Sequence, residues 1–171
     1  MERSSRQRAR SIVQARAGQR EAAEKLVRLL REEKVPLWRA TAAALLKRVS
    51  SDPGVAQALL ELASDPDSLV RAMAARALEP TERQTAPAIQ SGLRGLLRDP
   101  VRLVRIEAAW SLRATLETNE PATQELQRYL AFNNDQPSGA LQLGTYFLDR
   151  GEREKAFECF QRAVRWDGAS A

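Results

Sequence analysis

The sequence predicts an all-α protein, a right-handed α-solenoid of stacked antiparallel helix pairs. Apolar residues recur at three- and four-residue spacing, the period of a buried helical face, and no stretch alternates in the manner of a β-strand. One helix pair recurs after 34 residues. Repetition of one small unit at such a period is typical of solenoids, because each unit buries its apolar face only by stacking on its neighbours.

The composition is that of a globular chain. Hydrophobic residues make up 43% of the 171 residues and charged residues 29%, which does not fit a disordered or membrane-spanning sequence. No apolar run approaches the length of about 20 residues that a membrane helix needs. The first twenty residues lack the apolar segment of a signal peptide, so we expect none there.

The residue inventory excludes several kinds of chemistry. The chain has no histidine, which removes imidazole catalysis and histidine metal sites. Cys159 is its only cysteine, so there is no intramolecular disulfide and no CxxCH haem attachment, and we expect an inert thiol. Glycine patterns for phosphate binding are also missing. We therefore expect no enzyme activity, no catalytic residue, no cofactor and no metal.

The helical period and the turn residues together place ten helices along the chain. Proline, glycine and polar clusters separate them, and Asn133–Pro137 is the strongest boundary signal. The expected helices lie near residues 4–16, 19–32, 36–49, 54–64, 67–78, 87–98, 101–115, 121–133, 138–149 and 153–166.

The 34-residue repeat centres on a helix that follows an Asp-Pro dipeptide. Residues Asp65–Leu78 return as Asp99–Leu112, and Leu37–Leu46 is a degenerate earlier copy without Asp-Pro. The aspartate can cap the helix by accepting from its first amides, and proline fits a first turn. Leu69 and Leu103 fall in the apolar pattern, so we expect them to be buried and aspartate there to unfold the array.

This motif resembles the HEAT repeat, whose second helix commonly begins with Asp-Pro and continues with Val-Arg and paired alanines. In that family the aspartate and the arginine help to link successive repeats. The resemblance therefore implies a structural role, rather than ligand binding, for Asp65, Arg71, Asp99 and Arg105.

The end of the chain resembles a single tetratricopeptide repeat. In such a hairpin small residues permit a close helix crossing and large ones fill the groove. The matching structural positions are Leu143, Gly144, Ala156 and Phe160. We therefore expect HEAT-like repeats with a basic N-terminal helix in residues 1–118, a spacer helix and boundary in 119–136, and a hairpin like a tetratricopeptide repeat in 137–171.

The order of these parts is similar to that of a bacterial family in which multihaem c-type cytochrome domains precede HEAT and then tetratricopeptide repeats. That order runs from Ala15–Gly18 through Arg39–Ala42 and the two Asp-Pro repeats to the spacer helix Gln124–Phe132. The resemblance implies a docking module of an exported, periplasmic redox protein. No haem role transfers to this chain, which has no CxxCH motif.

We expect the protein to be an interaction scaffold, because repeat arrays present an extended concave surface to a protein partner or to a neighbouring domain. No membrane contact is expected, and the oligomeric state stays open. One candidate protein-contact surface lies on the first helix of the C-terminal hairpin. Its residues are Ser138, Leu141, Thr145, Leu148 and Asp149.

The alternative is nucleic-acid binding through the basic N-terminal stretch. The first twenty residues carry the whole net charge of +5, with six arginines against Glu2. Such a stretch could contact phosphate groups. A solvated helix end explains the same charge, and the remainder of the chain is balanced between acidic and basic residues.

Overall fold

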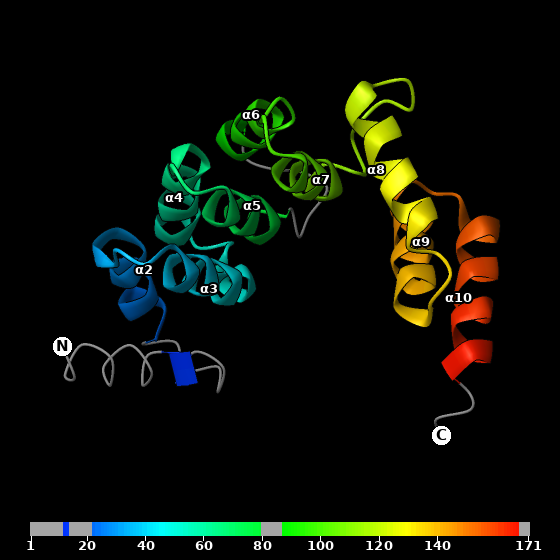
Figure 1. Cartoon of the computed structure of the whole chain (residues 1–171), viewed down its shortest axis with the longest axis horizontal. Coiled ribbons are helices and arrows are strands. Elements are labelled where there is room, and N and C mark those ends of the chain that lie inside the picture. Colours follow the sequence, from blue (N-terminus) through cyan, green and yellow to red (C-terminus); the bar gives the residue numbers. More distant parts are fainter. Residues whose placement is uncertain (1–11, 14–21, 80–86, 168–171) are drawn as a thin grey trace. The chain divides into compact units, whose positions relative to one another are not determined.

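The computed structural model describes residues 12–13, 22–79 and 87–167 (Figure 1). Within them the chain forms nine α-helices and two short 3₁₀ turns, with no β-strand. The predicted all-α solenoid class is therefore confirmed. The helix expected near 4–16 falls almost entirely outside the described residues. The chain divides into two compact units, residues 1–111 and 112–171, and each is described by itself.

The first unit consists of two layers of helices. Helices of one layer alternate with those of the other along the chain, and α5 packs between α3 and α7 in the second layer (Figure 1). The first layer holds α2 (Ala22–Glu32), α4 (Pro53–Glu61) and α6 (Pro87–Leu96). The second layer holds α3 (Pro36–Leu46), α5 (Ser68–Ala77) and α7 (Arg102–Ser111).

Alanine makes the close packing of the second layer possible. Ala72, Ala74, Ala75 and Ala77 of α5 are all buried. Because alanine has the smallest side chain that still favours a helix, it lets the backbones of α3, α5 and α7 approach one another at little cost in helix propensity. Val70 adds the largest buried side chain of α5 and fills the space at its N-terminal end.

The helix starts differ from the sequence interpretation in one respect. Asp67, and not Asp65, caps α5, accepting from the amides of Leu69 at 2.9 Å and Val70 at 3.3 Å. The Asp65 carboxylate instead accepts from the amide of Asp67 at 2.9 Å. The expected cap at Asp65 is therefore wrong, because the Asp-Pro dipeptide forms a turn just ahead of the helix.

The expected burial of Leu69 and Leu103 is also wrong. Leu69 is 36% exposed and Leu103 is 44% exposed. Helix α5 contacts α3, α7, α4 and the 3₁₀ turn Leu62–Ser64 that follows α4. Val70 and the alanines are the side chains of α5 that are buried in these contacts. A step of one residue turns a helix by about 100°, so Leu69 lies beside this buried arc, on the open side of the helix.

The second unit contains α8 (Pro121–Phe132), α9 (Pro137–Asp149) and α10 (Arg153–Asp167). Helices α9 and α10 form an antiparallel hairpin, and α8 contacts α9 (Figure 1). Gly151 makes the tight turn with φ of 80°, a backbone conformation that favours glycine. Among the described residues, no helix combines the length and hydrophobicity of a membrane span.

Candidate protein-docking surfaces

Arg71 joins two successive repeats of the first unit. Its Nε and Nη2 donate to the two carboxylate oxygens of Asp99 at 2.7 and 3.0 Å. Its Nη1 donates to the carbonyl oxygens of Asp65 at 2.8 Å and Pro66 at 3.1 Å. One guanidinium thus holds the turn before its own helix and the first residue of the next Asp-Pro turn.

The Arg71–Asp99 pair is shielded from water, with side chains that are 13% and 6% exposed. The hydrogen bonds from Arg71 lower the pKa of Asp99 below its ordinary value, and those to Asp99 raise the pKa of Arg71. Bidentate arginine–carboxylate pairs of this kind are among the stronger hydrogen-bonded contacts in proteins.

The same arrangement recurs one repeat earlier. Arg39 donates to the Asp65 carboxylate at 2.9 and 3.1 Å and to the carbonyl oxygens of Glu33 and Lys34 at 3.0 and 3.2 Å. In the sequence Arg39 stands 32 residues before Arg71. The degenerate repeat copy Leu37–Leu46 already indicates that Arg39 is equivalent to Arg71. Its ion pair with Asp65 was not predicted.

Arg105 of the third repeat makes the same contacts to backbone carbonyl oxygens as Arg71. Arg105 donates to the carbonyl oxygens of Asp99 at 2.9 Å and Pro100 at 3.1 Å. We call this series of arginine contacts the arginine ladder. Its members are Arg39, Asp65, Arg71, Asp99 and Arg105. Its two ion pairs, Arg39–Asp65 and Arg71–Asp99, each join one repeat to the next and are largely shielded from water.

A second series of equivalent residues does reach the surface. Leu37, Leu69 and Leu103 occupy the same position at the start of α3, α5 and α7, and they are 56%, 36% and 44% exposed. We call these three residues the leucine row. Since α5 packs between α3 and α7, the row runs across three repeats on one layer of the unit. Val35 and Val101, also exposed, extend it in two of the three repeats.

Charged residues border the other end of the same helices. Lys47 forms an ion pair with Glu79. Nη1 of Arg76 lies 3.7 Å from Oε1 of Glu107, which makes a second ion pair. Burial raises the pKa of Glu107, an effect that the positive charges of Arg76 and Lys47 partly offset. The face of α3, α5 and α7 is therefore apolar at the helix starts and ion-paired toward the helix ends.

The contact surface predicted on α9 lies on one side of that helix. Leu141 and Leu148 are half-exposed and Ser138 is exposed. The Thr145 hydroxyl donates to the carbonyl oxygen of Leu141 at 2.9 Å, and Asp149 accepts from Nε of Arg113 at 2.6 Å. Asp149 is thus already engaged within the unit. A contact role for these five residues stays a prediction.

The four positions singled out in the hairpin lie at the crossing of α9 and α10. Gly144 and Ala156 are buried, and Leu143 and Phe160 are half-buried. A Cβ atom on Gly144 would come within 2.6 Å of Cδ1 of Phe160. The ring therefore lies directly against the glycine backbone, which explains the small residue at this position.

The described residues include side chains of the kinds that can ligate a metal ion and the chain's single thiol, that of Cys159. No three side chains among them that could ligate a metal ion come together. Cys159 is buried, and this burial raises the pKa of its thiol. A raised pKa leaves little thiolate at neutral pH, and the thiolate is the nucleophilic form.

The sequence pattern of HEAT repeats matches residues 3–79 and again residues 62–141, which together cover most of the chain. No curated protein and no solved structure matches the chain. The family match agrees with the two layers of helices and with the repeated Asp-Pro turn of the first unit. The chain belongs to the HEAT-repeat family.

Proposed function

We propose that this protein is an interaction scaffold that binds a helical segment of a partner protein along the leucine row. HEAT repeats are generally protein-interaction scaffolds, and helical-repeat solenoids are typically non-catalytic. The observation that carries the proposal is the exposure of Leu37, Leu69 and Leu103 at the same position in three packed helices. Single exposed leucines are ordinary, but a periodic row of them is typical of a binding surface.

The repeat geometry favours one kind of partner. Packed helices lie about 8–10 Å apart, so successive leucines of the row are separated by about that distance. Seven residues of an α-helix span about 10.5 Å. A partner helix that crosses α3, α5 and α7 with an apolar residue at every seventh position would therefore meet all three leucines.

The experiment compares two sets of substitutions in affinity purification from the source organism, followed by mass spectrometry. The first variant is Leu37→Ser/Leu69→Ser/Leu103→Ser, and the second is Leu141→Ser/Leu148→Ser on α9. Loss of a partner with the first variant and its retention with the second supports the proposal. The opposite pattern would assign binding to the α9 surface, and a partner retained by both variants would exclude both surfaces.

The nucleic-acid alternative finds less support in the first unit. Arg71 and Arg105 are engaged in the arginine ladder, and Arg76 lies beside Glu107. The basic stretch of residues 1–20 falls almost wholly outside the described residues. Titration of random duplex DNA with the full chain and with a version that starts at Glu21 distinguishes nucleic-acid binding from protein binding. Micromolar binding that persists after truncation and falls steeply with salt would favour nucleic acid.

The wider setting of the scaffold is also a proposal. The order of motifs supports a docking module in a larger exported redox protein, in which the hairpin resembles a tetratricopeptide repeat and the location is periplasmic. The family match itself extends to HEAT repeats alone. The upstream coding sequence tests this setting, since repeated CxxCH motifs there would support it and their absence would remove the reason for it.

A further inference from the structure

Helix α10 has two apolar faces. One of them, formed by Ala156, Cys159 and Ala163, is buried in the second unit, where α10 packs on α9. On the other, Phe157 is 62% exposed and Val164 is 67% exposed. Surface helices of globular proteins normally have one apolar stripe, so the second stripe needs a separate explanation.

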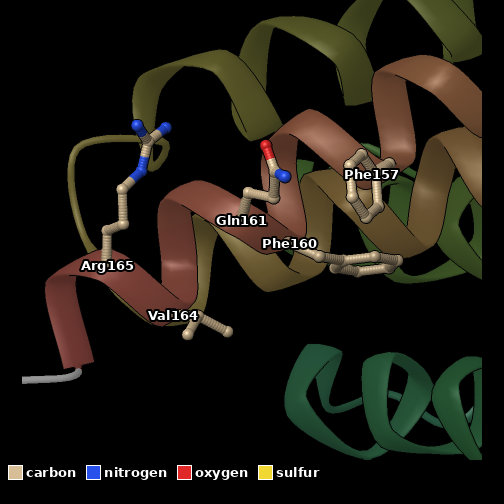
Figure 2. Close-up of a pocket in the computed structure, with 5 residues that line it drawn as sticks. All are labelled: Phe157, Phe160, Gln161, Val164 and Arg165. Carbon is tan, nitrogen blue, oxygen red and sulfur yellow. The ribbon is translucent and has the colours of Figure 1, made fainter.

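The second face is continuous along the helix. Phe157, Phe160, Gln161, Val164 and Arg165 line an open groove on it (Figure 2). Their spacing of three and four residues over two turns is the spacing that another helix packs against. We call these five residues the α10 stripe.

We infer that the α10 stripe pairs with the α10 stripe of a second copy of this chain, with the two helices antiparallel. A two-fold axis that passes between Phe160 and Gln161 places Phe157 of one copy beside Val164 of the other. The same contact then forms twice, because a two-fold interface is self-complementary. The largest exposed side chains of the stripe are covered in this register.

The charges beside the stripe fit this register. Arg165 of one copy falls, along the helix axis, midway between Glu154 and Glu158 of the other, and all three residues are exposed. Their side chains project from the same flank of the helix, at angular positions within about 40° of one another by the 100° step per residue. A parallel pair in register would instead leave Arg165 seven residues, about 10.5 Å along the helix axis, from the nearer of these glutamates, Glu158. Charge complementarity therefore selects the antiparallel second copy.

Other charged residues of α10 already have partners inside the second unit. Lys155 forms an ion pair with Glu152, and Arg162 donates to the Asn134 side chain. Arg165, Glu154 and Glu158, in contrast, form no ion pair among the described residues of the structure. A second copy in the antiparallel register would supply an ion-pair partner for each of these three residues.

A contact made by one helix of each copy is small. Stable interfaces bury about 1,600 Å² in total, and smaller ones are typical of weak or transient complexes. We therefore expect a dimer with a dissociation constant in about the micromolar range, which forms at high protein concentration and weakens with salt.

The test is analytical ultracentrifugation of the full chain from about 1 to 500 μM, a range that brackets a micromolar dissociation constant. Wild type should pass from monomer to dimer, and Val164→Glu should stay monomeric with an unchanged circular dichroism spectrum. Arg165→Glu alone and Glu154→Lys/Glu158→Lys alone should each be monomeric. An equimolar mixture of these two variants should form a heterodimer, since it restores both sets of opposite charges. The control Arg28→Glu on α2 should dimerise like wild type.

Three outcomes would overturn the proposal. Wild type that stays monomeric over the whole range would exclude a second copy as the occupant. A dimer that persists in Val164→Glu would place the interface elsewhere. Monomeric single variants whose mixture also stays monomeric would exclude the antiparallel register. None of these outcomes bears on the leucine row, which lies in the other unit.

Discussion

Arg71 of α5 donates two hydrogen bonds to the carboxylate of Asp99, 28 residues further along the chain, at 2.7 and 3.0 Å. This contact joins the helix of one repeat to the turn that starts the next helix. It also gives the aspartate of the Asp-Pro motif a physical reason, because its carboxylate pairs with the arginine of the preceding repeat.

Removal of Arg71 should destabilise the first unit strongly. Arg71→Ala leaves the shielded Asp99 carboxylate without its main partner, and loss of one member of a buried pair costs about 3–5 kcal/mol. The matched control is Arg31→Ala, which breaks the exposed ion pair to Glu61 at 3.3 Å and should cost at most about 1 kcal/mol. Urea denaturation measures both. Equal effects would show that the ladder adds no more than a surface pair.

The stabilisation from Asp99 should depend on pH in a defined direction. Its pKa is lower in the folded state than in the unfolded chain, so the contribution is fully present above the unfolded value of about 4 and is lost as the pH falls through the folded value. The difference in unfolding free energy between wild type and Arg71→Ala should therefore be constant near neutrality and shrink below about pH 4. A difference that is the same at pH 7 and pH 2 would contradict this.

Exposure decides the outcome of aspartate substitutions at neighbouring positions. Leu69→Asp places the charge in water and should change the unfolding free energy by about 1 kcal/mol or less. Val70→Asp buries the charge in the core and should prevent folding or cost several kcal/mol. Arg94→Asp, on exposed surface of α6, should melt close to wild type. Thermal melts followed by circular dichroism measure all three, and unfolding by Leu69→Asp would refute the exposed leucine row.

Two helical glycines should respond oppositely to alanine. At Gly144 the new methyl group would overlap the Phe160 ring, and such overpacking costs about 1–3 kcal/mol. At Gly95 no atom lies within 4 Å, so alanine should stabilise α6 by about 0.5–1 kcal/mol through helix propensity. Phe160→Leu should partly relieve Gly144→Ala if the ring is the cause. Denaturant midpoints of the four proteins test this.

The sequence predicts the helices well, because the spacing of apolar residues and the residues that start and stop helices are local properties of the chain. The helices expected near 36–49, 87–98, 121–133 and 138–149 are found with starts within one residue and ends within three. Proline is the first residue of each of these four helices, and its missing amide hydrogen fits only a helix start. Composition and spacing therefore determine where most helices begin.

The sequence does not predict which apolar side chains stay exposed. Leu69 and Val70 are adjacent and equally apolar, and only the positions of α3, α4 and α7 around α5 decide that one is exposed and the other buried. The pairing of Arg39 with Asp65 was likewise not predicted, because the aspartate lies 26 residues further along the chain, in the next repeat. Both features depend on neighbours that the chain supplies some 30 residues away.

The most direct test of the scaffold is site-specific photo-crosslinking in the source organism. A photoreactive residue replaces Leu37, Leu69 or Leu103 in turn, with Gln57 on α4 and Ser91 on α6 as exposed controls on the other layer. We expect one partner protein to crosslink at all three leucine positions and not at the controls. The crosslinked partner residues should fall in order within one helix, spaced by about seven residues. Crosslinks that are as strong at Gln57 and Ser91, or absent from all three leucine positions, would contradict the account.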